Sequence, residues 1–321
     1  MSRSFPTIST LRLAALALPA LIILLSLTAC DLGDLAKQEI GVTGVTAGIP
    51  NPAIDSYPAW SPDGTVIAFY HHGVTYASYA ERGYIIHPDS VGIWFIAPDG
   101  SDKRMFLQGG RNPAWGPQGK KLVFNSGQQI FKIMANGDGL TQLTFEGRNF
   151  FPAISPDGNS IVYDSNLDDT KYDVWLMLID GKNKRNISLT GASTQVEPGR
   201  RPRWSPDGNK IIHERFDANT NAETDIYTMD TGGAQSKFLG PGSTARYSPD
   251  GRQITFAYDS NIWVMDNTGK NQVKLTSDLG FEPSWSPDGQ HIVYGGPEHT
   301  LWIMESDGRN KRQFTFKPDS L

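Results

Sequence analysis

Residues 58–69 read Pro-Ala-Trp-Ser-Pro-Asp-Gly-Thr-Val-Ile-Ala-Phe, and this stretch decides the fold. Its Ser-Pro-Asp-Gly core suits a tight turn, because Pro presets φ, Asp can bond its own backbone and Gly accepts positive φ. The core recurs six times, and the second copy reads Gly-Pro-Gln-Gly. The copies are residues 61–64, 116–119, 155–158, 205–208, 248–251 and 286–289. Successive prolines are 38 to 55 residues apart, a period typical of propeller blades.

Each copy predicts four short strands in the same order. A first strand ends just before the turn, in most copies with an aromatic residue, and a second strand follows the turn. A third strand carries pairs such as Ile93-Trp94 and Leu301-Trp302, and a fourth strand closes the unit. Apolar residues occupy both faces of the strands, as in Ile67-Ala68-Phe69, which is typical of sheets that stack face to face. We therefore interpret the aromatic residues as core between blades.

The fold class predicted from these repeats is all-β, a six-bladed β-propeller of four-stranded antiparallel blades. The array starts on a first strand and ends on a fourth, so each blade is expected to be one contiguous repeat. Two alternatives stay open: a seventh blade, or a strand borrowed from residues 41–57.

The first 30 residues have the pattern of an export signal. Arg3 and Arg12 precede an almost wholly apolar stretch, residues 13–29, which ends in Leu-Thr-Ala before Cys30. This ending resembles the bacterial lipobox, in which the Cys is lipidated. The alternative is a short transmembrane anchor that stays attached. The domain prediction is a signal peptide (1–29), a lipidated Cys30 with a flexible tether (30–57), and a propeller (58–321).

Charge and cysteine content exclude some classes of function. The chain has a net charge of −5, and without residues 1–29, which hold two Arg and no acid, 27 basic against 34 acidic residues leave −7. An acidic protein does not attract nucleic acid by bulk electrostatics. One Cys in the chain allows no internal disulfide.

Sequence motifs of catalysis are missing. The chain contains no Gly-x-Ser-x-Gly elbow, no His-Glu-x-x-His and no Walker loop. His71 and His72 are adjacent, and neighbours on a strand point to opposite faces, so they do not predict a metal site. His213 stands where the other blades have Phe or Tyr, and we interpret it as packing. We expect no cofactor, no metal and no enzymatic activity.

The repeat resembles a known family. Pro-Ala-Trp-Ser-Pro-Asp-Gly with Ile-Ala-Phe, followed by Ile-Trp-x-x-x-x-Asp-Gly at residues 93–100, is similar to the TolB-like propeller repeat, also called the WD40-like PD40 repeat. The resemblance covers about residues 58–316. It implies a six-bladed propeller in the bacterial envelope, and in TolB this propeller docks a peptidoglycan-associated lipoprotein and other partners. The chain departs from TolB in its lipobox and in residues 31–57, which are too short for the α/β domain that precedes the TolB propeller.

The loops suggest where a partner binds. The Ser-Pro-Asp-Gly turns and the turns between third and fourth strands share one face of the ring, here called the turn face. The opposite face, the variable-loop face, carries loops of very different length, including the insertion 71–92 with Tyr76 and Tyr79. Variable loops on a rigid scaffold are common binding sites.

Arginines gather where the chain enters the first strands, and we expect them at the mouth of the channel on the variable-loop face. They are Arg111, Arg148, Arg200, Arg201, Arg203 and Arg246. Blades four and five have Arg203 and Arg246 directly before the aromatic residue, where the other blades have Ala or Ser. Guanidinium groups bind carboxylates in bidentate fashion, so an anionic group such as a peptide carboxylate or an acidic sugar is the expected ligand.

The function predicted from the sequence is a monomeric scaffold of the cell envelope, lipid-anchored on the extracytoplasmic side in the periplasm or at the cell surface. It binds an envelope protein or peptide through the variable-loop face. The alternatives are an envelope enzyme of glycan lyase or hydrolase type, and a small-ligand sensor that uses the channel mouth.

Overall fold

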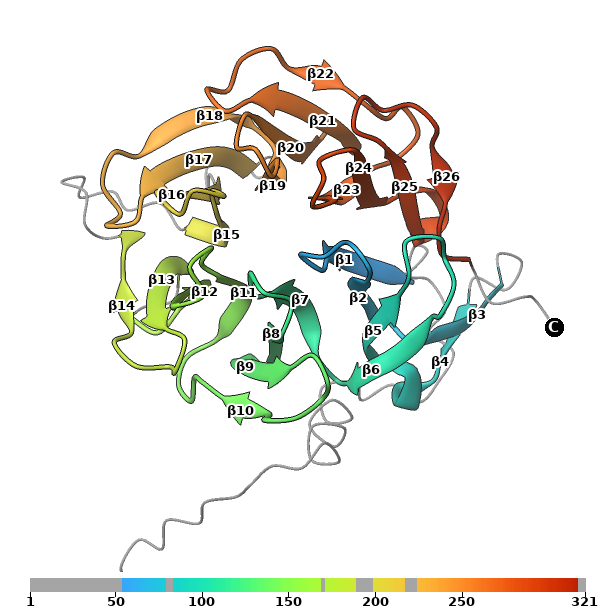
Figure 1. Cartoon of the computed structure of the whole chain (residues 1–321), viewed down its shortest axis with the longest axis horizontal. Helices are drawn as coiled ribbons and strands as arrows, with labels where there is room; N and C mark the ends of the chain where they lie inside the picture. The colour runs from blue at the N-terminus through green and yellow to red at the C-terminus, as the bar shows by residue number, and fades with distance from the viewer. Residues whose placement is uncertain (1–53, 79–82, 169–170, 189–198, 217–223, 317–321) are drawn as a thin grey trace, which may run out of the picture.

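The protein is a closed ring of six β-sheet blades. The computed structural model describes residues 54–78, 83–168, 171–188, 199–216 and 224–316. These residues form six four-stranded antiparallel sheets around a central axis (Figure 1). Each sheet is built from a continuous stretch of chain, and within the described ranges no blade takes a strand from another. The predicted six-bladed propeller of contiguous repeats is therefore confirmed.

The blades have the same strand order, from the axis outward. Blade 1 contains β1 (Asp55–Trp60), β2 (Ile67–His71), β5 (Gly92–Ile96) and β6 (Arg104–Gln108); blade 2 contains β7 (Arg111–Trp115), β8 (Lys121–Ser126), β9 (Gln129–Met134) and β10 (Thr141–Gln142); blade 3 contains β11 (Asn149–Ile154), β12 (Ser160–Ser165), β13 (Asp173–Leu178) and β14 (Arg185–Asn186). Blade 4 contains β15 (Gly199–Trp204), β16 (Lys210–Phe216), β17 (Thr224–Asp230) and β18 (Lys237–Pro241); blade 5 contains β19 (Ser243–Tyr247), β20 (Gln253–Tyr258), β21 (Asn261–Asp266) and β22 (Val273–Lys274); blade 6 contains β23 (Phe281–Trp285), β24 (His291–Gly295), β25 (Leu301–Glu305) and β26 (Arg312–Gln313).

The Ser-Pro-Asp-Gly turns are held by their own side chains. In blade 1 the Ser61 hydroxyl donates to Asp63 Oδ1 at 2.6 Å, and the same oxygen accepts the Thr65 N–H at 3.0 Å. These bonds lower the pKa of Asp63, with the Ser61 hydroxyl as the largest cause. Four other blades repeat the Ser–Asp bond. The second blade has Gly116 and Gln118 in their place and keeps the backbone turn, with Gly119 N–H bonded to Gly116 O at 2.9 Å.

The core lies between blades rather than within them. Six clusters of buried apolar side chains fill the six interfaces, as predicted for sheets with two apolar faces. The cluster that closes the ring packs Ile67 and Phe69 of blade 1 against Val293 and Leu301 of blade 6. Burial of large side chains at every interface makes the whole ring one packed unit.

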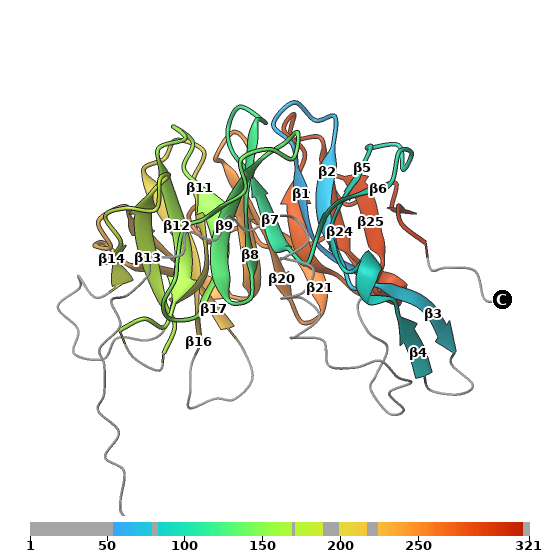
Figure 2. The same cartoon turned by 90° about the horizontal axis from the view of Figure 1, so that it is seen from below.

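The two faces of the ring differ (Figure 2). The turns between β1 and β2 and their equivalents lie together on one side, and the hairpin of β3 (Val74–Ser78) and β4 (Gly83–Ile86) projects from the other. The first strand starts at the variable-loop face, because the Ile54 N–H bonds the carbonyl of His299 in a loop of that face at 2.9 Å. Among the described residues, no helix is long and apolar enough to cross a membrane.

Candidate functional site

Every innermost strand contains a β-bulge at the same place. Each innermost strand ends in an aromatic residue or Ile. The pairing with the second strand shifts between the residue four positions before this end and the residue one position before it. A bulge bends the strand and re-aims a side chain. The repeated bulge therefore divides the channel wall into two sets of side chains at two depths.

The bulged residue adopts the left-handed conformation in all six blades. These residues, here called the bulge layer, are Tyr57 (φ 53°), Asn112 (φ 52°), Phe151 (φ 51°), Arg201 (φ 48°), Thr244 (φ 52°) and Glu282 (φ 55°). A non-glycine residue in this region costs roughly 1–2 kcal/mol. Such strain persists only where the surrounding fold imposes it, and here it directs five of these six side chains to a small space at the axis.

The bulge layer closes the channel. Tyr57 of blade 1 and Phe151 of blade 3 meet edge to face, with ring centroids 5.6 Å apart, although blade 2 separates their blades. The Arg201 guanidinium lies over the Phe151 ring at 5.0 Å, and Glu282 Oε2 accepts the Tyr57 N–H at 2.6 Å. The cavity left at this depth measures about 10 Å³, room for no more than one water molecule.

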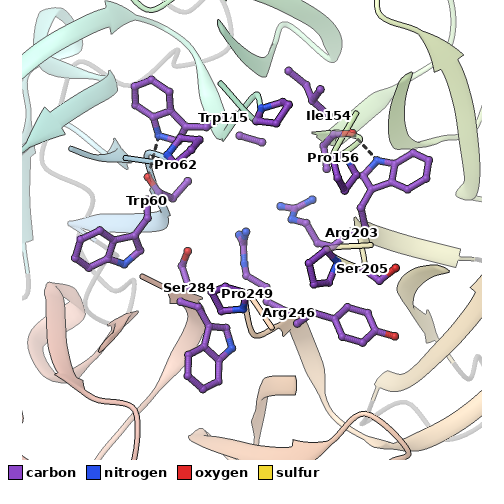
Figure 3. A pocket seen from close by; sticks show the side chains of 18 of the residues that line it. Trp60, Pro62, Trp115, Ile154, Pro156, Arg203, Ser205, Arg246, Pro249 and Ser284 are labelled. Atoms are coloured by element: carbon purple, nitrogen blue, oxygen red, sulfur yellow. Dashed lines mark hydrogen bonds between the residues drawn. The ribbon is translucent and has the colours of Figure 1, made fainter. Parts of the chain in front are cut away.

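A wider cavity opens above the bulge layer at the turn face. It measures about 300 Å³ and is lined by the turn prolines and the aromatic residues that end the inner strands (Figure 3). The residues one before those aromatics, here called the mouth layer, also line it: Ala59, Ala114, Ala153, Arg203, Arg246 and Ser284. Arg203 and Arg246 extend into the open centre of this cavity in Figure 3. Among the described lining residues there is no Asp or Glu.

The two arginines of the mouth layer are poorly compensated. Arg203 Nη1 donates to the carbonyls of Phe151 at 3.1 Å and Pro202 at 2.9 Å. Burial lowers the pKa of Arg203 well below its usual value, and the charge of Arg246 lowers it further. Burial also lowers the pKa of Arg246 to about 10, and the nearest opposing charge is Glu282 in the layer below. Within the part of the chain that the structure describes, no group accepts a hydrogen bond from Arg246.

The six arginines predicted to surround one mouth do not form one site. Arg203 and Arg246 lie at the turn face, so their assignment to the variable-loop face was wrong. The reason is the direction of the inner strands, which start at the variable-loop face and end at the turn face. A residue directly before the last aromatic of such a strand therefore lies at the far end of the channel.

The other four arginines occupy different surroundings. Arg200 Nε lies 3.6 Å from Asp164 Oδ2, and its guanidinium stacks over Tyr172. Arg201 pairs with Glu214 at 2.9 Å. The guanidinium of Arg111 lies 5.0 Å from the Tyr70 ring centroid, and Arg148 is exposed. These arginines therefore belong to local contacts nearer the variable-loop face.

Three predicted site residues stay untested. Tyr76 is part of β3, whose side chains are not described. Tyr79 and the proposed lipidation site Cys30 fall outside the described residues. No group of three or more His, Cys, Asp or Glu side chains that could hold a metal ion occurs in the described ranges. His213 is buried in the blade 4 sheet, where burial lowers its pKa to about 3.

The bulge layer is the part of the site that sequence reasoning missed. A signal was present, since these residues stand three positions before the aromatic and five of the six precede a proline. The residue type differs in every blade at this position, which suits a side chain that faces the channel rather than the repeated core.

The buried carboxylate of Asp164 predicts a pH-dependent stability. Asp164 is fully buried, and burial raises its pKa to about 6 despite Arg200. The pKa of Asp164 is higher in the folded than in the unfolded chain, so ionisation of this carboxyl group destabilises the fold. This destabilisation grows as the pH rises through about 4 to 6. We compare the free energies of unfolding of Asp164→Asn and the unchanged protein. The difference between them should shift in favour of the variant by about 1 kcal/mol from pH 5 to pH 8. Urea unfolding at both pH values measures this, and a difference that does not vary with pH would contradict it.

Comparison with known proteins agrees with the architecture. Residues 164–320 match the model of PD40, the TolB beta propeller domain. An uncharacterized protein of Agrobacterium fabrum (strain C58) is 27% identical over 205 residues, which are 58% of this chain and 64% of that protein, so the chain spans less than two thirds of its relative. Blades 1 and 2 lie entirely before the matched region and repeat its architecture.

Solved structures show the same fold. A putative TolB from Agrobacterium tumefaciens superposes with a TM-score of 0.58 at 21% identity, covering 74% of this chain and 88% of the other. TolB from Acinetobacter baumannii gives a TM-score of 0.57 at 19% identity, covering 93% and 85%. At these identities the likeness concerns the fold alone. The matched model identifies residues 164–320 as part of a β-propeller domain of the PD40, or TolB, type, and the solved structures have the same fold.

Proposed function

We propose that this protein is a membrane-tethered scaffold of the bacterial envelope that binds a protein or peptide partner and holds an acidic group of that partner at the turn-face mouth of its channel. The observation that carries the proposal is the pair Arg203 and Arg246. They share a cavity of about 300 Å³ whose described lining contains no carboxylate.

Two adjacent arginines at this depth lower the free energy of unfolding of the protein without a ligand. The pKa of Arg246 is lowered and that of Arg203 is lowered further, so the fold disfavours their positive charge. An anionic ligand reverses this penalty, because guanidinium groups form strong bidentate bonds with carboxylates in surroundings that exclude water. Other blades fill the same position with Ala or Ser, so the fold does not require arginine there.

The envelope location rests on the sequence. The apolar stretch 13–29 and Cys30 support export and lipidation, and two or more acyl chains give stable attachment to a membrane. The tether predicted for residues 31–57 is shorter than expected, because β1 begins at Asp55; as a flexible chain, residues 31–53 would span roughly 25 Å. The fold type alone does not assign a partner, and the partner is identified by the experiment below.

The test is crosslinked affinity capture from intact envelopes, read by mass spectrometry. The variant Arg203→Ala/Arg246→Ser copies the residues of blades 3 and 6 and should fold. We expect partners captured by the unchanged protein to be lost by this variant, because each buried charge contact removed costs about 2–5 kcal/mol. Arg148→Ala removes an exposed arginine away from the cavity and should capture normally.

Stability separates a lost site from a lost fold. We expect Arg246→Ser to raise the free energy of unfolding by on the order of 1 kcal/mol, since water in the cavity screens part of the charge. A stable double variant that captures the same partners as the unchanged protein would refute the proposed site.

A further inference from the structure

The cavity at the turn face is a dead end. The cavity at the mouth layer measures about 300 Å³, whereas a separate space of only about 10 Å³ remains among the side chains of the bulge layer. The rings of Tyr57 and Phe151 are in contact although their blades are not adjacent, the Arg201 guanidinium lies over Phe151, and Glu282 accepts the Tyr57 N–H. A ligand that enters from the turn face therefore cannot pass through the ring and must present an end or a short projection.

The walls offer few polar side chains for the hydroxyl groups of a sugar. Sugar hydroxyls need both acceptors and donors, and among the described lining residues there is no Asn, Gln, Asp or Glu. The hydroxyls of Ser155, Ser205 and Ser248 in this wall already donate to the aspartates of their own turns. The remaining surface consists largely of aromatic and prolyl side chains, which favour an extended peptide.

The charge lies beyond the apolar rim. The turn prolines, such as Pro62 and Pro249, stand at the rim, and the guanidinium groups of Arg203 and Arg246 extend into the centre from neighbouring blades 4 and 5 (Figure 3). A ligand that matches this arrangement carries its negative charge at its leading tip and apolar surface behind it. The carboxylate at the C-terminus of a peptide has this form, because no side chain or further residue extends beyond it.

We propose that the cavity receives the free C-terminal end of an extended peptide, with the terminal carboxylate bound between Arg203 and Arg246. This rests on the proposed binding function and specifies its ligand. The volume of about 300 Å³ is at the lower limit of ligand clefts, so only the last few residues of the chain enter. Glu282, which accepts the Tyr57 N–H, lies in the layer below, and its negative charge offsets only part of the positive charge of Arg246.

The test uses peptide pools and the full chain purified in detergent. Immobilised protein is incubated with a randomised pool of acetylated pentapeptides that have free carboxyl ends, and with the same pool amidated. Two further probes are cyclic peptides with one internal Asp or Glu, and oligogalacturonates. Bound material is quantified by mass spectrometry. We expect retention of the free acids to exceed that of the amides by at least about tenfold.

The variants connect this retention to the cavity. Arg203→Ala/Arg246→Ser should abolish the preference for free acids, and Arg148→Ala should keep it. Equal retention of acids and amides, or stronger retention of cyclic peptides or oligogalacturonates, would overturn the C-terminal ligand. If envelope capture still depends on the two arginines in that case, the proposed function stands and only this inference fails; if capture is also independent of them, both fail.

Discussion

Replacing Glu214 by Ala is expected to lower the free energy of unfolding by about 2–3 kcal/mol, because Arg201 loses its paired carboxylate and the Thr244 N–H loses its acceptor. Glu214 is 2% exposed, pairs with Arg201 Nη1 at 2.9 Å, and accepts the N–H of Thr244 in the next blade. Its side chain therefore stabilises two residues of the bulge layer at once. Urea unfolding followed by tryptophan fluorescence measures the loss.

Two variants define the cause of this loss. Glu214→Gln keeps an acceptor for the Thr244 N–H but removes the charge beside Arg201, so we expect an intermediate effect. Glu305→Ala removes an acid at the exposed Glu305–Arg309 pair, where we expect a change within about 0.5 kcal/mol. A loss below about 1 kcal/mol for Glu214→Ala would show that the buried pair does not support the bulge layer.

The second large effect concerns the core between blades. We expect Phe256→Ala to cost about 3–5 kcal/mol, because a fully buried phenyl ring leaves a cavity that packed neighbours fill only in part. Phe256 packs with Ile212 and Ile226 of blade 4 and Met265 of its own blade. Since each blade contacts its neighbours in a closed ring, the loss should shift one cooperative transition for the whole propeller.

Phe238→Ala is the matched control for this prediction. Its ring is 51% exposed on β18, so we expect a change within about 0.5 kcal/mol. Equal effects of the two substitutions, or a separate unfolding step for blades 4 and 5, would contradict a core shared between blades.

The fold could be read from the sequence because its signals are local and repeated. The turn residues fix each hairpin through side-chain bonds such as Ser61 to Asp63. Each strand then pairs only with strands that are its neighbours in the sequence repeat. The six-blade count followed from the number of turns. The β3–β4 hairpin was identified only as an insertion, because nothing in the repeat specifies its pairing.

The site was predicted only in part, for geometric reasons. Arg203 and Arg246 stood out because they replace small residues of the repeat, but the face to which they belong depends on strand direction. The bulge layer depends on backbone torsions, and a φ of 53° at Tyr57 or 51° at Phe151 has no clear signature in residue type. Contacts between blades that are not adjacent, such as Tyr57 to Phe151, join segments that are far apart in sequence.

The start of β1 has a consequence for how the protein is oriented in the cell. Ile54 is bonded to the carbonyl of His299, so the chain enters the ring from the variable-loop side. With the proposed lipid on Cys30, the flexible tether would join the ring on that side. The arginine-bearing opening lies on the opposite face, where the tether does not obstruct it and where it can meet partners that are not attached to the same leaflet.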